Sequence, residues 1–266
     1  MGTKRTPSGE LEIAIAPPVA TVTIDAPDNE NRLNPTSLQE LGTVVEDLRD
    51  RADIHAIVFT GAGDDWFSAG LMNAEIRAAM TKDDVIDYVV TANRIFDMLE
   101  ALPQITICAI NGKIVAGASE LALACDIRIA GAHSTLMLPE ARWGGFPGAG
   151  GPVRLPMAVG HGHALELIAT GKEIDAAEME RIGFAEHVKP KGKVVAAAME
   201  TAHAIGANGP LATRGAKSIA RARKEPGLRA ARDLSDALRR ALEWSHDVDE
   251  GLAAAREGRP PKFTGR

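Results

Sequence analysis

The pattern of apolar and polar residues in the first half of the chain predicts strands separated by helices. Residues 19–25 alternate strictly between apolar and polar side chains, as a strand with one buried face does. Further runs are almost continuously apolar and end at glycine or at Asn-Gly, which predicts buried strands. These runs are residues 54–60, 105–110 and 127–130.

Two segments between these strands have the spacing of amphipathic helices. Asn34 is a suitable N-cap before Pro35, and an apolar residue then recurs every three or four positions as far as Leu48. A second, longer helix is predicted over residues 81–102. The side chains that we expect on its inward face are Val85, Val89, Phe96 and Leu99.

The pattern becomes helical and rich in alanine from about Pro152 onward. The segment from Gly206 to Gly209 predicts a boundary between a core of residues 1–205 and a helical region of residues 206–266. Strands interleaved with helices and followed by further helices predict an α/β fold with a helical C-terminal region.

Two helices are predicted within that C-terminal region, over residues 228–244 and 247–257. In the second, Asp247 and Glu250 have the spacing of a helix-capping pair. The Pro-containing tail that follows is expected at the surface.

The composition is ordinary for a globular protein and excludes several classes. The 266 residues are 45% hydrophobic and 25% charged, and no run approaches the ~18 uncharged apolar residues that a membrane helix needs. Residues 1–10 lack the apolar core of a secretion signal. Cys108 and Cys125 are too few for a disulfide framework or a cysteine-rich zinc site. We therefore expect a cytoplasmic protein that does not contact membranes.

The net charge of −6 argues against a protein that binds nucleic acid along its whole length. The charge is unevenly spread, because residues 210–245 carry +5 and the remainder −11. A solvated helix face explains such a basic window, and a phosphate-facing surface is the alternative. Its basic residues are Arg214, Lys217, Arg221, Arg223, Lys224, Arg229, Arg232, Arg239 and Arg240.

Glycine-containing stretches that follow strand-like runs are the candidate sites: residues 66–71, 111–120 and 139–151. None has the spacing of a dinucleotide fingerprint or of a phosphate-binding P-loop. Glycine at a strand-to-helix turn lets backbone N–H groups face a ligand, and a helix N-terminus favours negative charge. Gly117 is such a position, although a tight turn with Glu120 complementing the helix dipole is the alternative.

Glu140 follows a strand-like segment and has Trp143 and Phe146 nearby in the sequence. Apolar surroundings raise the pKa of a carboxyl group toward neutrality, which would make Glu140 a usable proton donor. A glutamate in a surface loop is the alternative.

Other candidate residues lack the partners that their chemistry needs. His161 and His163 have no acidic or thiol residue placed nearby, so we expect surface residues rather than metal ligands. Ser68 and Ser119 lack the G-x-S-x-G pattern of a serine hydrolase, so no serine nucleophile is expected.

Taken in order, these segments resemble the crotonase family, the enoyl-CoA hydratase/isomerase superfamily. The resemblance runs from about Glu12 to Arg266. The segments that carry it are Phe67–Gly70, Asn111–Glu120, Pro139–Gly151 and the tail Glu250–Gly265.

The resemblance implies a crotonase-like spiral of ββα repeats and a helical C-terminal region through which the chain assembles as a homotrimer or homohexamer. It implies an acyl-CoA thioester as substrate, with coenzyme A part of that substrate, no other cofactor and no metal. It also implies that basic residues of the C-terminal helices can meet the CoA phosphates, in some members from a neighbouring subunit.

The resemblance also implies residue roles. The backbone N–H groups of Leu71 and Gly117 would form an oxyanion hole for the thioester carbonyl. Glu120 matches the residue that holds and activates water, and Glu140 matches the one that exchanges a proton at the α-carbon. Gly148 matches the glycine whose backbone helps to position the water.

The expected substrate pocket includes Ala69, Met72 and Trp143. Because isomerases and several hydrolases of the superfamily often keep only one of the two acids, the presence of both Glu120 and Glu140 favours an enoyl-CoA hydratase, a lyase of fatty acid metabolism. The alternatives are double-bond isomerisation, C–C bond cleavage or thioester hydrolysis on an acyl-CoA, and a non-catalytic acyl-CoA-binding subunit.

Three segments depart from the family pattern. Residues 71–73 are Leu-Met-Asn where the family usually has Ala-Asp, which alters the acyl pocket. Asn29 and Glu30 stand where many members have basic residues, so a CoA phosphate contact is either missing or shifted to Arg32. Residues 116–118 are Ala-Gly-Ala instead of three glycines. These differences concern the acyl group more than the fold.

Overall fold

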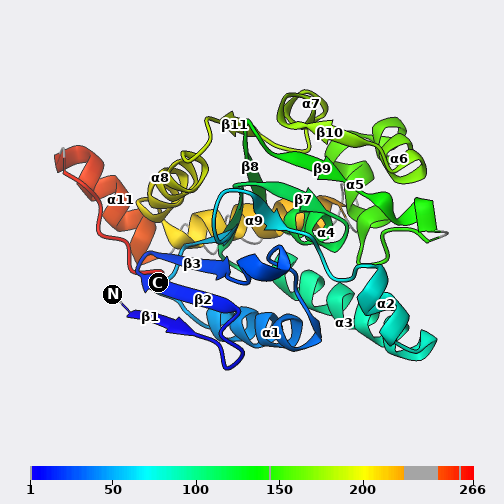
Figure 1. The fold of residues 1–266 in the computed structure, drawn as a ribbon. Helices are drawn as coiled ribbons and strands as arrows, with labels where there is room; N and C mark the ends of the chain where they lie inside the picture. The colour runs from blue at the N-terminus through cyan, green and yellow to red at the C-terminus, as the bar shows by residue number, and fades with distance from the viewer. Residues whose placement is uncertain (1, 144, 225–244, 258) are drawn as a thin grey trace.

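The computed structural model describes residues 2–143, 145–224, 245–257 and 259–266, and it has the α/β fold that the sequence predicts (Figure 1). The predicted helix 228–244 and most of the basic window lie outside the described residues. The strands are β1 (Gly2–Arg5), β2 (Leu11–Ala16), β3 (Val19–Ile24), β4 (Ala56–Gly61), β5 (Trp66–Ser68), β6 (Ile105–Ile110), β7 (Lys113–Val115), β8 (Ile127–Gly131), β9 (Thr135–Met137), β10 (Glu173–Asp175) and β11 (His187–Lys189).

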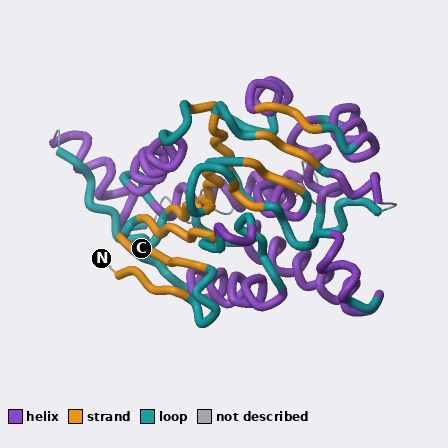
Figure 2. The backbone as a smooth tube through the Cα atoms, in the orientation of Figure 1, coloured by secondary structure: helices purple, strands orange, loops and turns teal. Residues whose placement is uncertain are grey.

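Helices connect and cover these strands (Figure 2). The α-helices are α1 (Pro35–Arg49), α2 (Ala74–Ala79), α3 (Lys82–Glu100), α4 (Gly117–Ala124), α5 (Gly151–Val159), α6 (His161–Thr170), α7 (Ala176–Ile182), α8 (Val194–Gly206), α9 (Pro210–Lys224) and α11 (His246–Glu257). Two 3₁₀ helices are η1 (Pro27–Asn29) and η2 (Pro139–Trp143). Within the described ranges, none of the helices has the length and apolar character needed to cross a membrane.

The chain winds as a spiral in which each turn adds one strand to each of two sheets and then a helix. The larger sheet has the order β1-β2-β3-β4-β6-β8-β11, and the smaller has the order β10-β9-β7-β5. Thus β4, β6 and β8 lie in the first sheet, while β5, β7 and β9 follow them into the second. This arrangement confirms the ββα spiral.

The central strands are buried on both faces, which explains their continuous apolar runs. All six residues of β4 are buried. Ile57 and Phe59 belong to the main core beneath α1 and α3, whereas Ala56 and Val58 pack in a second cluster with Ala198 of α8. Each face of the sheet is therefore covered by helices.

The start of α1 is built as predicted. The Asn34 Oδ1 accepts hydrogen bonds from the backbone N–H groups of Thr36 (2.9 Å) and Ser37 (3.0 Å), and Pro35 begins the helix. This cap satisfies two N–H groups that would otherwise lack partners.

Helix α3 is present as predicted, but the prediction of which residues form its buried face was partly wrong. Phe96 and Leu99 are buried as expected, whereas Val85 and Val89 are only half-buried. The buried stripe instead continues through Tyr88, Ala92 and Ile95. The aromatic ring of Tyr88 reaches the core at a position where the apolar pattern alone pointed to its valine neighbours.

The strands β1, β2, β5, β7, β10 and β11 and the helix α2 were not predicted. Elements of three or four residues carry too few positions to establish a period. Strands β5, β7, β9 and β10 form the second sheet, of which the sequence pattern indicated only β9, as the strand-like segment before Glu140.

Two basic residues of the C-terminal region are used to attach α9 to the core. The Lys217 Nζ donates to the Gln104 carbonyl (2.8 Å) and pairs with Asp126 (2.7 Å), and its side chain is 4% exposed. Arg214 donates to the carbonyl of Ala52 (3.0 Å). Lys217 is therefore not an exposed candidate for a CoA phosphate. The division of the chain into two domains stays a prediction.

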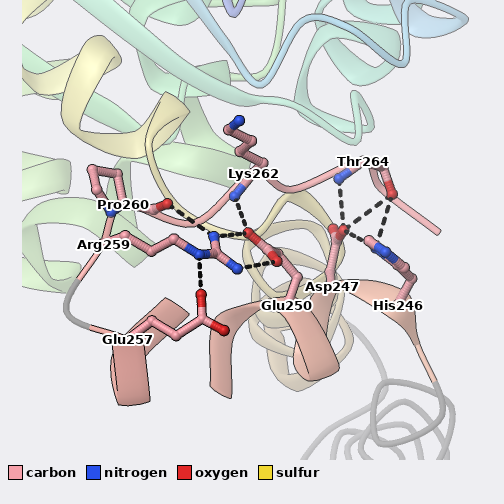
Figure 3. Close-up of polar contacts among 8 residues, drawn as sticks. All are labelled: His246, Asp247, Glu250, Glu257, Arg259, Pro260, Lys262 and Thr264. Atoms are coloured by element: carbon pink, nitrogen blue, oxygen red, sulfur yellow. Dashed lines mark hydrogen bonds and ion pairs between the residues drawn. The ribbon is translucent and has the colours of Figure 1, made fainter. Parts of the chain in front are cut away.

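The C-terminal tail folds back along α11, at one edge of the molecule (Figures 1 and 3). Asp247 accepts hydrogen bonds from the N–H groups of Thr264 (2.6 Å) and Gly265 (2.9 Å). Glu250 accepts from the Lys262 N–H (2.6 Å) and pairs with Arg259 (2.7 Å). The predicted capping pair is therefore wrong, because both acids lie within α11 and bind the tail.

Candidate active site

A tight turn after β5 brings the backbone of residues 69–71 close to the start of α4. Gly70 has φ +85° and donates its N–H to the Ser68 Oγ (3.0 Å). A side chain there would place its Cβ 2.9 Å from the Gly117 nitrogen and 2.7 Å from the Val115 carbonyl oxygen. Glycine is thus required both by the backbone angle and by the close approach.

Two side chains and one backbone N–H group fix the orientation of this turn. The Arg32 Nη1 donates to the Ala69 carbonyl (2.8 Å), and the Leu33 N–H donates to the Gly70 carbonyl (3.0 Å). The Tyr88 hydroxyl donates to the Leu71 carbonyl (3.4 Å) and to the Leu33 carbonyl. None of these supporting roles was predicted.

Arg32 does not occupy an exposed position suited to a phosphate contact. Its side chain is 7% exposed and pairs with Glu30 (2.7 Å) while it holds the Ala69 carbonyl. The expectation that a CoA phosphate contact has shifted to Arg32 is therefore corrected: this guanidinium braces the turn from within the protein.

The second segment, Ala116-Gly117, meets the first at the N-terminus of α4. Ala116 has φ 56° and ψ −127°, a strained conformation for a residue with a side chain. A Cβ on Gly117 would lie 2.6 Å from the Leu71 Cγ, so the Leu71 side chain lies directly against the Gly117 backbone. Within the described residues, the N–H groups of Leu71 and Gly117 donate to no protein acceptor.

Glu120 lies one helical turn beyond Gly117, in a helix whose every residue is buried. Its side chain faces the turn before α5, where its Oε1 accepts the N–H of Gly151 (2.7 Å). Burial raises the pKa of Glu120 to about 8, the charge of Glu140 adds to the rise, and the Gly151 N–H opposes it. Glu120 is therefore a buried acid that can exchange its proton near neutral pH.

Glu140 lies in η2, immediately after β9, and faces the same region. Burial raises its pKa to about 7. Among the described residues its Oε2 is buried without a hydrogen-bond partner. A buried carboxyl oxygen without a donor favours the protonated form, which can give a proton to a ligand. The structure thus brings together the two glutamates that the sequence singled out.

The turn of residues 148–151 supports Glu120 from the side of α5. The carbonyl of Gly148 accepts the Asn93 Nδ2 (2.6 Å). Gly150 has φ +112°, and Gly151 supplies the N–H that holds Glu120. Gly151 is a site residue that sequence reasoning missed, although its place in a glycine-rich stretch after Glu140 was a visible signal.

The structure describes the side chains of two of the three expected pocket residues. Ala69 is buried and Met72 is half-buried against the core. Asn73, the last residue of the segment that departs from the family pattern, caps α2 by accepting the Ile76 N–H (2.8 Å). The side chain of Trp143 lies outside the described part of the structure.

Other candidate residues have no such arrangement. Cys108 and Cys125 are both buried and free, and His161 is exposed. Within the described ranges, no group of three or more His, Cys, Asp or Glu side chains is placed to hold a metal ion. The Ser68 hydroxyl is engaged with the Gly70 N–H.

The site combines two backbone N–H groups that have no acceptor among the described residues with two acids whose pKa values lie near neutrality. Amides at a helix N-terminus and an adjacent turn stabilise an oxygen that acquires negative charge. Two carboxyl groups that titrate near neutrality can accept and donate protons in one reaction. The arrangement suits the formation of an enolate and proton transfer next to it.

Comparison with known proteins identifies relatives of this chain along most of its length. The family model described as enoyl-CoA hydratase/isomerase matches residues 15–266. YngF of Bacillus subtilis, an enoyl-CoA hydratase/isomerase by name, is 36% identical over 247 residues, which cover 93% of this chain and 95% of that protein. The short-chain-enoyl-CoA hydratase of Clostridium acetobutylicum is 36% identical over 196 residues, covering 74% of this chain and 75% of that one.

The fold is shared with a solved structure of similar size. A crystal structure of an enoyl-CoA hydratase from Bacillus anthracis superposes with a TM-score of 0.94 at 34% identity, covering 97% of this chain and 100% of that one. The similarity therefore extends over the spiral core and the C-terminal helices together.

Proposed function

Because this chain belongs to the enoyl-CoA hydratase/isomerase family, we propose that it is a hydratase, a lyase that adds water across the double bond of a 2-enoyl-CoA thioester. The observation that carries the proposal is the pair Glu120 and Glu140. Glu120 is buried and Glu140 is half-buried, the charge of Glu140 acts on Glu120, and the pKa values of both are raised into the neutral range. Hydration needs one group to take a proton from water and another to give a proton to carbon.

The thioester carbonyl would accept the N–H groups of Leu71 and Gly117. When water adds to the β-carbon, electrons move onto the thioester oxygen and form an enolate, and these two amides stabilise its charge. The contact between the Leu71 side chain and Gly117 keeps the two amides in a fixed relation. Such preorganisation is what makes hydrogen bonds to a developing charge effective.

The two acids would divide the proton transfers. Glu120 takes a proton from the water whose oxygen bonds to the β-carbon, and Glu140 gives its proton to the α-carbon as the enolate collapses. The Gly148 backbone helps to position the water. After one turnover Glu120 holds the proton that Glu140 has lost, and exchange with solvent restores the starting state.

Both acids titrate in the range that proton transfer near neutrality needs, although the higher pKa, that of Glu120, by itself puts the first proton on Glu120, so the assignment of roles rests on hydrogen bonding. Coupled acids titrate as a unit, so pKa values of about 7 and about 8 give a pair that holds one proton mainly between these two pH values. The Gly151 N–H favours the carboxylate on Glu120. The partnerless oxygen of Glu140 favours the proton there.

The test is mass spectrometry of short, long, branched and aromatic enoyl-CoA thioesters after incubation with the purified protein. Gain of one water by any member of the panel, lost in Glu140→Gln, is the expected result. Isomers of unchanged mass would indicate an isomerase, and liberated fragments would indicate C–C cleavage or thioester hydrolysis. Tight CoA binding without any turnover would indicate a non-catalytic subunit.

We also propose a cytoplasmic homotrimer or homohexamer that needs no cofactor beyond the CoA of its substrate. Large apolar side chains on and next to α5 are exposed, with Phe146 67%, Val153 74% and Met157 60% exposed. Exposed apolar side chains that cluster on one helix are typical of a surface buried by assembly. Light scattering during size-exclusion chromatography distinguishes monomer, trimer and hexamer.

A further inference from the structure

The turn of residues 148–151, which holds Glu120, is itself held from behind by Arg154. The Arg154 Nη1 donates to the Ala149 carbonyl (3.3 Å). The next peptide groups lead to Gly151, whose N–H donates to the Glu120 Oε1 (2.7 Å). Only Gly150 thus separates the residue whose carbonyl Arg154 binds from the residue whose N–H Glu120 accepts.

The Arg154 side chain is held rigidly in place. It is 8% exposed and pairs with two acids of α3: with Asp97, and with Glu100 through its Nε (2.9 Å). A planar guanidinium with several partners is well suited to fixing geometry in a buried setting. The ion pairs therefore connect the turn to α3, the helix that also supplies Asn93 to the Gly148 carbonyl.

The space around Gly150 shows how closely the Arg154 side chain approaches the turn. A Cβ built on Gly150 would lie 2.0 Å from the Arg154 Nη1. Gly150 also has φ +112°, which residues with side chains rarely adopt. The glycine is therefore needed to let the guanidinium lie directly against the backbone of the turn.

We propose that Arg154 is a positioning residue for the acid pair: it holds the 148–151 turn so that the Gly151 N–H stays on Glu120, and its positive charge stabilises the carboxylate form of Glu120. This inference rests on the proposed function, in which Glu120 must be a carboxylate to accept a proton from water. Arg154 acts through the turn and is not proposed to touch the substrate.

Among the described residues, Glu140 and Arg154 are the charged groups that act on the pKa of Glu120, so the effect of removing the Arg154 charge can be measured. Glu140 acts from η2 and Arg154 from α5, and α3 contributes Asp97 and Glu100, which pair with Arg154. From β7, the Lys113 ammonium lies over the Trp66 ring instead. Burial raises the pKa of Glu120, and the charge of Arg154 is one of the influences that oppose the rise.

The test compares Arg154→Met with Arg154→Lys and with a matched control, Arg128→Met. Arg128 is equally buried, with an 8% exposed side chain, and pairs with Glu186, but it binds carbonyl groups near the other end of α4, including that of Cys125. Two properties are measured: the pH dependence of turnover, and the titration of the Glu120 carboxyl by ¹³C NMR, assigned by its loss in Glu120→Gln.

In Arg154→Met we expect Glu120 to titrate at higher pH than in the parent, and the acid limb of the turnover profile to move in the same direction. Turnover near pH 7 should fall by about 10- to 100-fold, the size of loss that a small misplacement in an active site can cause. Arg154→Lys should restore the titration toward the parent because it keeps the charge. Arg128→Met should lower the melting temperature and leave both pH readouts unchanged.

An unchanged Glu120 titration in Arg154→Met would overturn the proposal and leave Arg154 a structural residue like Arg128. If that variant does not fold, Arg154→Gln, which keeps a donor for the Ala149 carbonyl but has no charge, is measured in the same way. The NMR titration needs no substrate. A shifted titration in a protein that hydrates no enoyl-CoA would therefore refute the proposed function while supporting the role of Arg154.

Discussion

Two pairs of acidic residues carry the same carboxyl group with different hydrogen-bond donors around it. Burial raises the pKa values of Glu120 and Glu140 to about 8 and about 7. Glu250 lies on α11 with 13% of its side chain exposed, and hydrogen bonds from Arg259 and from the Lys262 N–H lower its pKa to about 2 (Figure 3). Its neighbour Asp247 likewise accepts N–H groups of the tail.

The difference shows that the hydrogen-bond donors around a carboxyl group decide what the group can do. Glu250 has donors for both oxygens and stays ionised over the whole working pH range, so it serves as a fixed anchor for the tail. Glu140 has a buried oxygen without a partner among the described residues, so its proton is easily gained and lost near neutrality. Only the second arrangement suits proton transfer.

The largest effect is expected when a glutamate of each region is replaced by glutamine, which has no proton to exchange near neutral pH. Glu140→Gln or Glu120→Gln should lower turnover of the true substrate by about 10²- to 10⁴-fold, because each substitution removes a general acid or base. Glu250→Gln should change turnover by less than about twofold, since Glu250 only binds the tail. Steady-state kinetics, with circular dichroism to confirm folding, measures this, and a near-native rate in either core variant would rule out the mechanism.

A second substitution tests the contribution of the two backbone amides to turnover independently of the two acids. Gly117→Ala places a methyl group 2.6 Å from the Leu71 Cγ, so the two segments that carry the proposed oxyanion amides must move apart. Because loss of one such donor costs about 10²–10³ in rate, we expect turnover to approach that loss while both acids still titrate.

The matched control for that substitution is Gly162→Ala in α6, where a new Cβ meets nothing within 4 Å. It should keep full turnover and raise stability by about 0.4–1 kcal/mol, because alanine lowers the entropy of the unfolded chain. Equal rates for the two alanine variants would show that the contact between Leu71 and Gly117 is unimportant for catalysis.

The two regions should respond to pH with opposite signs. At a pH below the ordinary carboxyl pKa, Glu120 is protonated in folded and unfolded chains alike and costs nothing. As the pH rises from there to about 8, the unfolded chain releases this proton while the folded chain keeps it, so stability falls. Glu250, with its lowered pKa, stabilises the fold above the ordinary carboxyl pKa and loses this contribution as the pH falls toward 2.

Thermal melts of Glu120→Gln and Glu250→Gln against the parent test these signs. The stability advantage of Glu120→Gln should grow from about pH 5 to about pH 9, because glutamine has no proton to lose. The deficit of Glu250→Gln should shrink as the pH is lowered from about 5 to about 3. Curves that run parallel to the parent in both variants would contradict the assigned pKa shifts.

The smallest effect is expected at the tail itself. Arg259→Met removes the guanidinium that binds Glu250 and Glu257, so the Lys262 N–H should exchange faster with deuterium. Exposed ion pairs contribute little to global stability, and turnover should remain close to that of the parent. Amide hydrogen exchange resolved at the tail residues measures this, and unchanged exchange would show that Glu250 holds the tail without Arg259.

The sequence alone predicted those features that depend on neighbours along the chain. The cap of α1 at Asn34, the buried strand β6 and the break between α8 and α9 follow from local pattern, because capping and burial on both faces leave marks in consecutive residues. The candidate acids Glu120 and Glu140 were also visible, as was the glycine-rich stretch that follows Glu140.

Tertiary structure decided which of these residues act on one another. The role of Asp247 and Glu250 was mistaken for a helix cap, because their real partners lie nine to eighteen positions further along the chain in the folded-back tail. The bracing of the oxyanion turn by Arg32 likewise leaves no local pattern, since Ala69 is distant in sequence.

The pKa values and hydrogen-bond partners of the two candidate acids were also decided by tertiary structure. A glutamate in a sequence has an ordinary pKa, and only the folding of α4 against the turn before α5 buries Glu120 and gives it the Gly151 N–H as partner. The sequence determined the fold class and the identities of the candidate acids because these depend on short-range periodicity and residue type. The structure decided their protonation and support, because solvent exclusion and hydrogen bonding depend on groups that only folding brings together.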